Sequence, residues 1–257
     1  KTQMTRCIHC TRCVRFAEDI AGVPEIGALY RGENMQITSY LEQSLSSEMS
    51  ANVIDLCPVG ALTSNPYAFA ARPWELRKTE TIDVMDAVGS NIRVDSRGEA
   101  VLRVMPRVNE AINEEWISDK TRFACDGLRN QRLDRPYIRK DGKLKPASWD
   151  EAFATIADRL KNVKGEHIAA LAGNLADLES MMALKRLMQA LESPHYDCRQ
   201  DGAKIDASDR ASYIMNTGIA DLEKADVVLL VDTNPRHEAP IVNTRLRKAY
   251  LNKGTSF

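Results

Sequence analysis

Four of the six cysteines fall into a pattern that can hold an iron–sulfur cluster. Cys7, Cys10 and Cys13 follow one another at every third position, and the more distant Cys57 directly precedes Pro58. Three thiolates on one loop can each bind one iron of a cubane, while the fourth thiolate comes from a cysteine elsewhere that precedes a proline. Proline removes a backbone N–H and fixes φ, which turns the chain away from the cluster. The spacing therefore predicts one [4Fe–4S] cluster on these four cysteines.

Other side chains near this loop were weighed as ligands. His9 is a candidate, but its place in a tight loop is expected to turn it away from the thiols. In a two-cluster ferredoxin a fourth cysteine of the run serves a second cluster, and Ala17 occupies that position here, so these residues should hold one cluster. Structural zinc usually takes two separated Cys-x-x-Cys or Cys/His pairs, which the chain lacks, although a zinc site stays an alternative. Cys125 and Cys198 are isolated and are interpreted as ordinary residues.

Three arginines, Arg6, Arg12 and Arg15, flank the three-cysteine loop. Guanidinium groups close to an anionic cluster would raise its reduction potential. Alternatively, they are surface side chains paired with Glu18 and Asp19. The sequence leaves both interpretations open.

The elements that must position the cysteines are predicted to form a small helical and loop region over residues 1–72. Residues 52–56 are expected to be the last turn of a helix that delivers Cys57. Residues 73–146 are predicted to be β-rich, since apolar residues alternate on both sides of a turn sequence at 95–98, the pattern of a hairpin. The alternating residues are Ile92, Val94, Val101 and Val104.

Residues 147–257 are predicted to form a partial α/β domain with an open parallel sheet. Ser148 and Glu151 have the spacing of a helix capping box. Further helices are expected at 178–191 and 239–251, and strands at 167–172 and 226–231. No Gly-x-Gly-x-x-Gly follows these strands, so nucleotide binding has no motif behind it.

The composition limits the classes of function. The chain has 257 residues, 44% apolar and 28% charged, as in ordinary globular proteins. A formal charge of −1 gives no overall field that would favour nucleic acid, and no apolar run has the length of a membrane span. Residues 122–145 hold eight Lys/Arg against three Asp, a net charge of 8 − 3 = +5, and a solvated linker is favoured over a docking strip there. We expect no nucleic-acid partner and no direct membrane insertion.

The sequence resembles the family of the 75 kDa iron–sulfur subunit of respiratory complex I (NADH:quinone oxidoreductase). The resemblance includes Met-Thr-Arg-Cys-Ile-His-Cys-Thr-Arg-Cys-Val-Arg-Phe at residues 4–16 and covers essentially the whole chain. Further matching segments lie at 55–64, 71–75, 113–123 and 232–236. It is most similar to the alphaproteobacterial and mitochondrial branch.

The resemblance implies a function and a setting. Cys7, Cys10, Cys13 and Cys57 would hold a relay cluster between flavin and quinone, in a subunit without an active site or catalytic residues of its own. Its partners would be the flavin-binding, ferredoxin-like and quinone-proximal subunits of the peripheral arm. That arm lies on the cytoplasmic side of the bacterial inner membrane or the matrix side of the mitochondrial one. The sequence is expected to be an internal piece of such a subunit, and the isolated piece can lose its cluster.

The resemblance also concerns the remaining domains. From about residue 73 the chain resembles the molybdopterin oxidoreductase fold, which this family contains without the molybdenum cofactor. Molybdopterin enzymes and some bacterial members of the family carry four further cysteines there, at positions where this sequence has Asp83, Asp86, Ser90 and Ser118. Carboxylates and hydroxyls are poor ligands for the soft irons of a cubane, so that cluster is expected to be absent. The alternative functions are a molybdopterin-dependent oxidoreductase, against which these substitutions argue, and a structural zinc protein.

Overall fold

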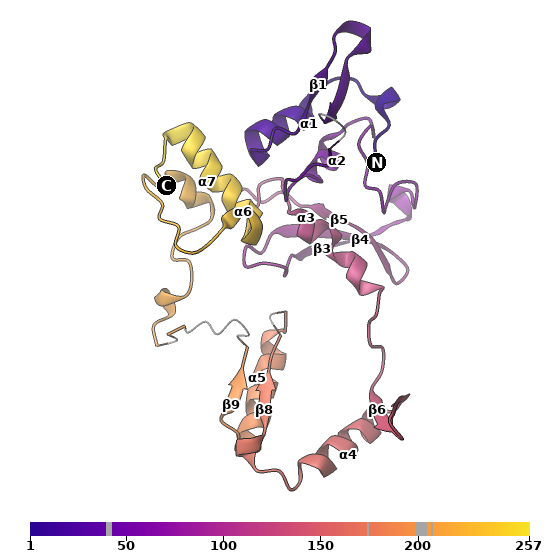
Figure 1. Ribbon diagram of the computed structural model, residues 1–257, viewed down its shortest axis with the longest axis vertical. Helices are drawn as coiled ribbons and strands as arrows, with labels where there is room; N and C mark the ends of the chain where they lie inside the picture. The colour runs from indigo at the N-terminus through magenta and orange to yellow at the C-terminus, as the bar shows by residue number, and fades with distance from the viewer. Residues whose placement is uncertain (40–42, 174, 199–204, 207) are drawn as a thin grey trace. The chain divides into compact units, whose positions relative to one another are not determined.

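The computed structural model describes residues 1–39, 43–173, 175–198, 205–206 and 208–257 (Figure 1). The described chain is mixed α/β, with mostly short helices and four small sheets. It divides into two compact units, one of residues 1–130 with 215–257 and the other of residues 131–214. None of the described helices combines the length and the apolar character needed to cross a bilayer. The division at residues 72 and 146 stays a prediction.

The first unit begins with the short helices that carry the cysteines. A 3₁₀ turn (Met4–Arg6) precedes the cysteine loop, and α1 (Arg12–Arg15) runs directly into a π-helical turn (Phe16–Ala21). The predicted helix before Cys57 is confirmed as α2 (Asn52–Leu56).

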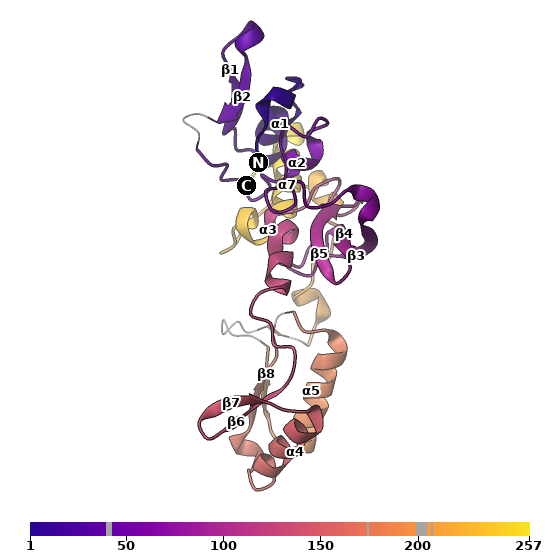
Figure 2. The ribbon, with the colours of Figure 1, turned by 90° about the vertical axis from the view of Figure 1, so that its right-hand side faces the viewer.

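An antiparallel hairpin lies between these helices in the sequence and was missed by the sequence analysis. It consists of β1 (Ile26–Leu29) and β2 (Gln36–Ser39) and stands beside α1 (Figure 2). Ile26 and Ile37 are buried against Ala17, with Cys7 and Cys13 packed on the same cluster. The hairpin therefore forms one wall of the cysteine region.

A three-stranded antiparallel sheet follows in the same unit. Its strands, in spatial order, are β3 (Arg77–Ile82), β4 (Asn91–Arg97) and β5 (Ala100–Pro106). The hairpin of β4 and β5 is confirmed, but its turn lies at residues 98–99 and not at 95–98. Asp95 is a strand residue because its fully buried carboxylate pairs with Arg93 at 2.9 Å and Arg103 at 2.7 Å. Helix α3 (Asp119–Phe123) packs on β5.

The apolar core of the first unit joins segments that are distant in sequence. The ring of Phe16 packs on Trp116 with centroids 4.9 Å apart. Ile241, 1% exposed, enters the same core from α7 (Pro240–Lys253), which confirms the helix predicted at 239–251. The buried residues of this core are Phe16, Met49, Val53, Val88 and Ile241.

Helix α7 also closes the end of the π-helical turn. Arg247 donates hydrogen bonds to the carbonyl oxygens of Glu18 at 2.8 Å and Asp19 at 3.2 Å. Pro24 has no N–H with which to reach the Asp19 carbonyl in the π-helical pattern. Gly22 has φ +71°, and a Cβ there would lie 2.9 Å from the guanidinium of Arg247. A side chain 228 residues later in the sequence thus completes the element that follows Cys13.

The strand predicted at 226–231 is wrong as a full strand. Within the described residues this segment forms one isolated parallel bridge, between Val227 and Ser256. Val227 is 72% exposed and Leu229 84% exposed. A buried parallel strand needs neighbouring strands on the same sheet, and the described residues give this segment one bridge and no strand partner.

Helix α6 (Pro235–Glu238) precedes α7 in the first unit, and the described part of the second unit contains two longer helices and two two-stranded sheets. The expected helix after Ser148 is α4 (Trp149–Leu160), and the Ser148 hydroxyl caps it by accepting the Glu151 N–H at 3.2 Å. The Glu151 side chain pairs with Lys140, so the reciprocal half of the capping box is not made. The other elements are β6 (Tyr137–Lys140), β7 (Lys143–Pro146), β8 (Ala169–Leu171), α5 (Leu178–Ala190) and β9 (His195–Asp197). β8 and β9 pair in parallel, with α5 between them in the sequence.

Candidate iron–sulfur site

The first three cysteines lie on a loop that is shaped by two left-handed residues. His9 has φ 53° and Thr11 φ 58°, and they bracket Cys10. The backbone N–H of His9 donates to the Cys7 sulfur at 3.4 Å. α1 begins at Arg12, so Cys13 lies in its first turn.

Cys57 is the C-terminal cap of α2, and the chain turns sharply after it. Pro58 follows, and Gly60 has φ +65°. This turn directs backbone N–H groups of residues 59–62 toward the Cys57 sulfur, the nearest being that of Leu62 at 3.4 Å. The guanidinium of Arg6 lies beside the turn, since a Cβ on Gly60 would be 3.8 Å from its Nη1.

The loop and the turn meet, so that all four cysteines line one pocket. Apolar residues from three elements complete it, among them Met4, Ile37 and Leu62, whereas His9 is not among its lining residues. The free space is about 20 Å³, close to that of one water molecule.

The environments of the four thiols are unequal. Burial raises the pKa of the Cys13 thiol above its ordinary value. Burial acts in the same direction on Cys57, but the N–H groups of residues 59–62 outweigh it and lower the pKa of that thiol. Donors that favour a thiolate also suit a metal ligand, because the thiolate is the ligating form.

The arginines near the loop do not pair with the carboxylates considered for them. In the described part of the chain, no ion pair joins Arg6, Arg12 or Arg15 to Glu18 or Asp19. The backbone carbonyls of Glu18 and Asp19 are instead bonded by Arg247.

The positions where a second cluster's cysteines were considered form a different kind of site. Asp83, Ser90 and Ser118 are at most 6% exposed. The Thr121 hydroxyl donates to the Asp83 carboxylate at 2.7 Å and lies 2.8 Å from the Ser118 hydroxyl. Asp86 pairs with Lys120 at 3.3 Å. Thr121 joins Asp83 to Ser118, and none of the four positions provides a thiolate, so they do not fit a cubane.

The other two cysteines lie apart from the four. Cys125 is half-buried, its thiol lies 3.8 Å from the Arg122 carbonyl, and burial raises its pKa. Cys198 is exposed. Neither lines the four-cysteine pocket.

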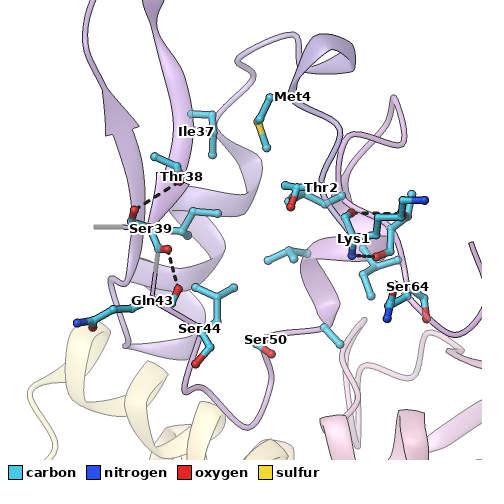
Figure 3. Close-up of a pocket in the computed structure, with 18 of the residues that line it drawn as sticks. Lys1, Thr2, Met4, Ile37, Thr38, Ser39, Gln43, Ser44, Ser50 and Ser64 are labelled. Atoms are coloured by element: carbon cyan, nitrogen blue, oxygen red, sulfur yellow. Dashed lines mark hydrogen bonds between the residues drawn. The ribbon is translucent and has the colours of Figure 1, made fainter. Parts of the chain in front are cut away.

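A cavity of about 790 Å³ in the first unit has no cysteine among its described lining residues (Figure 3). It lies between the end of β2 and the N-terminal segment, with Lys1 bonded through its amino group to the Thr63 carbonyl at 2.7 Å. Small hydroxyl residues such as Ser44, Ser50 and Ser64 line much of it. No His, Asp or Glu lies among its described lining residues.

Comparisons with known protein families divide the chain into three matches. Residues 1–63 match "NADH-quinone oxidoreductase subunit 3, ferredoxin-like domain". Residues 76–126 match "NADH-ubiquinone oxidoreductase NDSU1/NuoG-like, 4Fe-4S domain", and residues 132–257 match "Molybdopterin oxidoreductase". The chain is therefore an iron–sulfur protein of the NADH–quinone oxidoreductase class.

Similar proteins define the family more closely. The G subunit of NADH-quinone oxidoreductase from Rickettsia conorii is 61% identical over 246 residues, which are 96% of this chain and 37% of that protein. The mitochondrial 78 kDa subunit of NADH-ubiquinone oxidoreductase from Neurospora crassa is 57% identical over 98% of this chain and 34% of its own length. This chain belongs to the family formed by these two proteins, the NuoG-like subunits, and it spans about a third of their length.

Proposed function

We propose that this chain transfers single electrons through one [4Fe–4S] cluster held by Cys7, Cys10, Cys13 and Cys57, as part of an NADH:quinone oxidoreductase. The observation that carries the proposal is that four thiols from two separate segments line one pocket. The ferredoxin-like match at residues 1–63 supports it. When bound, such a cluster accepts and releases one electron at a time.

The side chains and the backbone of the site have separate tasks in this proposal. The four thiolates fix the cluster, one to each iron. The N–H groups of residues 59–62 offset negative charge on the Cys57 sulfur, and hydrogen bonds of this kind help to set a cluster's potential. Met4, Ile37 and Leu62 limit the access of water to the sulfurs.

A single zinc ion suits this arrangement less well. Zinc needs its ligands at about 2.0–2.3 Å from one point. Among the described residues, no three His, Cys, Asp or Glu side chains are grouped closely enough to hold one metal ion. A cubane distributes its thiolates over four irons, which agrees better with four thiols spread around a pocket.

We further propose that the chain works in the peripheral arm of the complex. Its partners would be flavin-binding, ferredoxin-like and quinone-proximal subunits, on the cytoplasmic side of a bacterial inner membrane or the matrix side of a mitochondrial one. The proposal rests on relatives that are named as subunits of NADH-quinone or NADH-ubiquinone oxidoreductases. Co-purification of the tagged chain with NADH-oxidising activity tests it, and recovery of the chain alone from membranes of its source would contradict it.

The remaining regions would serve as scaffold. We propose three parts, with residues 1–72 binding the cluster, 73–146 forming a β-rich part without a cluster, and 147–257 forming part of a molybdopterin-oxidoreductase-like open sheet. The match at residues 132–257 and the parallel pair β8–β9 support the last part. The oxygen side chains around Asp83 argue against a cluster in the middle part, and we expect no molybdenum cofactor. Metal analysis of the purified complex for molybdenum tests this.

Anaerobic reconstitution of the 257-residue chain with ferrous iron and sulfide tests the cluster. We expect about four irons and four sulfides per chain and an EPR signal after reduction. The Cys125→Ser variant is the matched control and should give the same iron count. A chain that binds one zinc and no stable iron would overturn the proposal.

A further inference from the structure

Helix α2, which delivers Cys57, is too short to hold its own position. It spans five residues (Asn52–Leu56), whereas isolated helices of fewer than about 12 residues are marginal in water. Its N-cap residue is Ala51, which has no side-chain oxygen, and the N–H groups of residues 52–54 are bonded only by carbonyls of the turn just before the helix. The position of Cys57 must therefore come from contacts outside the helix.

The start of α2 is bonded by Asp119, in the first turn of α3. Its Oδ1 accepts the backbone N–H of Ala51 at 2.9 Å, and its Oδ2 accepts the Ser50 hydroxyl at 2.6 Å. A carboxylate at this end also complements the positive end of the helix. A residue 68 positions later thus fixes the start of α2.

A second contact from α3 reaches the other end of the helix. Arg122, 6% exposed, pairs with Asp55 at 2.5 Å, two residues before Cys57. It also lies 3.4 Å from the Asn52 side-chain oxygen. The Asn52 amide exchanges two hydrogen bonds with the backbone of Ile117, at 2.8 and 3.2 Å. The helix is therefore held at its start, along its length and near its end by one segment.

That segment is anchored by the oxygen network described above. The Ser118 hydroxyl caps α3 by accepting the Thr121 N–H at 3.1 Å, and Thr121 in turn donates to Asp83 at 2.7 Å. The cap of α3 and the carboxylate that holds the start of α2 thus come from two consecutive residues, Ser118 and Asp119.

We propose that Asp119 and Arg122 are positioning residues for Cys57, so that the cysteine-poor segment 76–126 sets the geometry of the cluster in the segment before it. This inference rests on the proposed function for its cluster readout. Its structural content, that α3 fixes the turn at Cys57, does not require the cluster to be bound.

The first test measures amide hydrogen exchange of the chain before cluster loading. Asp119→Ala and Arg122→Met should speed exchange over residues 51–62 at least about tenfold, with less than about twofold change over the β1–β2 hairpin. Asp119→Asn and Arg122→Lys keep part of the contacts and should give smaller increases. Arg245→Met is the matched control, because Arg245 is equally buried at 3% exposed but pairs with Glu114 and Glu223. It should leave residues 51–62 unchanged.

The second test reconstitutes the same variants with iron and sulfide. Asp119→Ala and Arg122→Met should lower the iron bound per chain at least about twofold or change the reduced EPR line shape, while Arg245→Met does neither. If circular dichroism shows that Arg122→Met does not fold, the iron content and the EPR spectrum of Arg122→Lys are used to test the inference instead. Equal exchange rates in all variants over residues 51–62, or equal acceleration throughout the unit, overturn the inference. Failure of the unmodified chain to take up iron overturns the proposed function and leaves the exchange result to decide the inference.

Discussion

Residues 1–63 and 76–126 match families that are both described as iron–sulfur domains, yet their side chains are suited to opposite tasks. In the first segment four thiols surround a pocket, and the backbone offers N–H groups to one of them. In the second, the positions considered for thiols hold carboxylates and hydroxyls, two of which are joined through the Thr121 hydroxyl. The comparison teaches that a family match reports the backbone, whereas the donor atoms decide whether a metal cluster can bind.

The largest effect should come from removing one ligand of the first segment. Cys57→Ser is expected to lower bound iron from about four per chain to nearly none, because a serine oxygen is a poor ligand for a soft iron. Iron analysis and EPR after anaerobic reconstitution measure this. Normal iron content in Cys57→Ser would show that the fourth ligand lies elsewhere.

Removal of the cluster should affect the two segments to different extents. A ligand that binds only the folded state stabilises it, so chelation of the iron should speed amide exchange around the cysteine loop at least about tenfold. Strands β4 and β5, which belong to the other segment, should change less than about threefold. Hydrogen exchange with and without the cluster measures both, and an equal loss of protection would mean that the segments do not differ in this way.

A third change breaks the oxygen network of the second segment. Asp83→Ala should lower the free energy of unfolding by about 2–3 kcal/mol, since it leaves the buried Thr121 hydroxyl and the Met85 N–H without their acceptor. Urea unfolding of the unloaded chain measures this. Little change in stability would indicate that the network does not support the segment.

The pH dependence of stability should report the buried ion pairs of the β-sheet. Burial alone would raise the pKa of Asp95, but hydrogen bonds from Arg93 and Arg103 outweigh it and lower the pKa. The stabilisation is therefore complete above the ordinary aspartate pKa of 3.8 and is lost as the pH falls through the lower folded value. Between pH 6 and 2 the free energy of unfolding of the unmodified chain should fall by about 1 kcal/mol more than that of the Asp95→Asn variant. Parallel pH curves in urea unfolding would contradict this.

The smallest effect is expected at the surface of the same sheet. Glu80 pairs with Arg107 at 2.8 Å, but their side chains are 63% and 40% exposed. Glu80→Gln should change the free energy of unfolding by less than about 0.5 kcal/mol. A loss of unfolding free energy as large as that of Asp83→Ala would show that burial does not determine how much each of the two sites contributes to stability.

Much of the candidate site could be predicted because its signal is local. The cysteine spacing and the helix before Cys57 depend on a few neighbouring residues, and so do the caps and long helices at Ser148 and α7. The partners of α2 could not be predicted, since Asp119 and Arg122 act across 67–69 residues of sequence. The hairpin turn was placed too early because Asp95-Ser96 is typical of turns, whereas two arginines from the sheet hold Asp95 in a strand. The strand at 226–231 depends on neighbours that the described residues do not provide.

Because Arg247 bonds the backbone after Cys13, a fragment that contains the cysteine loop must also include α7 to keep this contact. An expression fragment that stops before α7 would leave the carbonyls of Glu18 and Asp19 without their guanidinium donor and would uncover the core around Ile241. The ferredoxin-like segment therefore shares contacts with α7, and we expect spectroscopy on a truncated version to describe a looser cysteine loop than the one in the 257-residue chain.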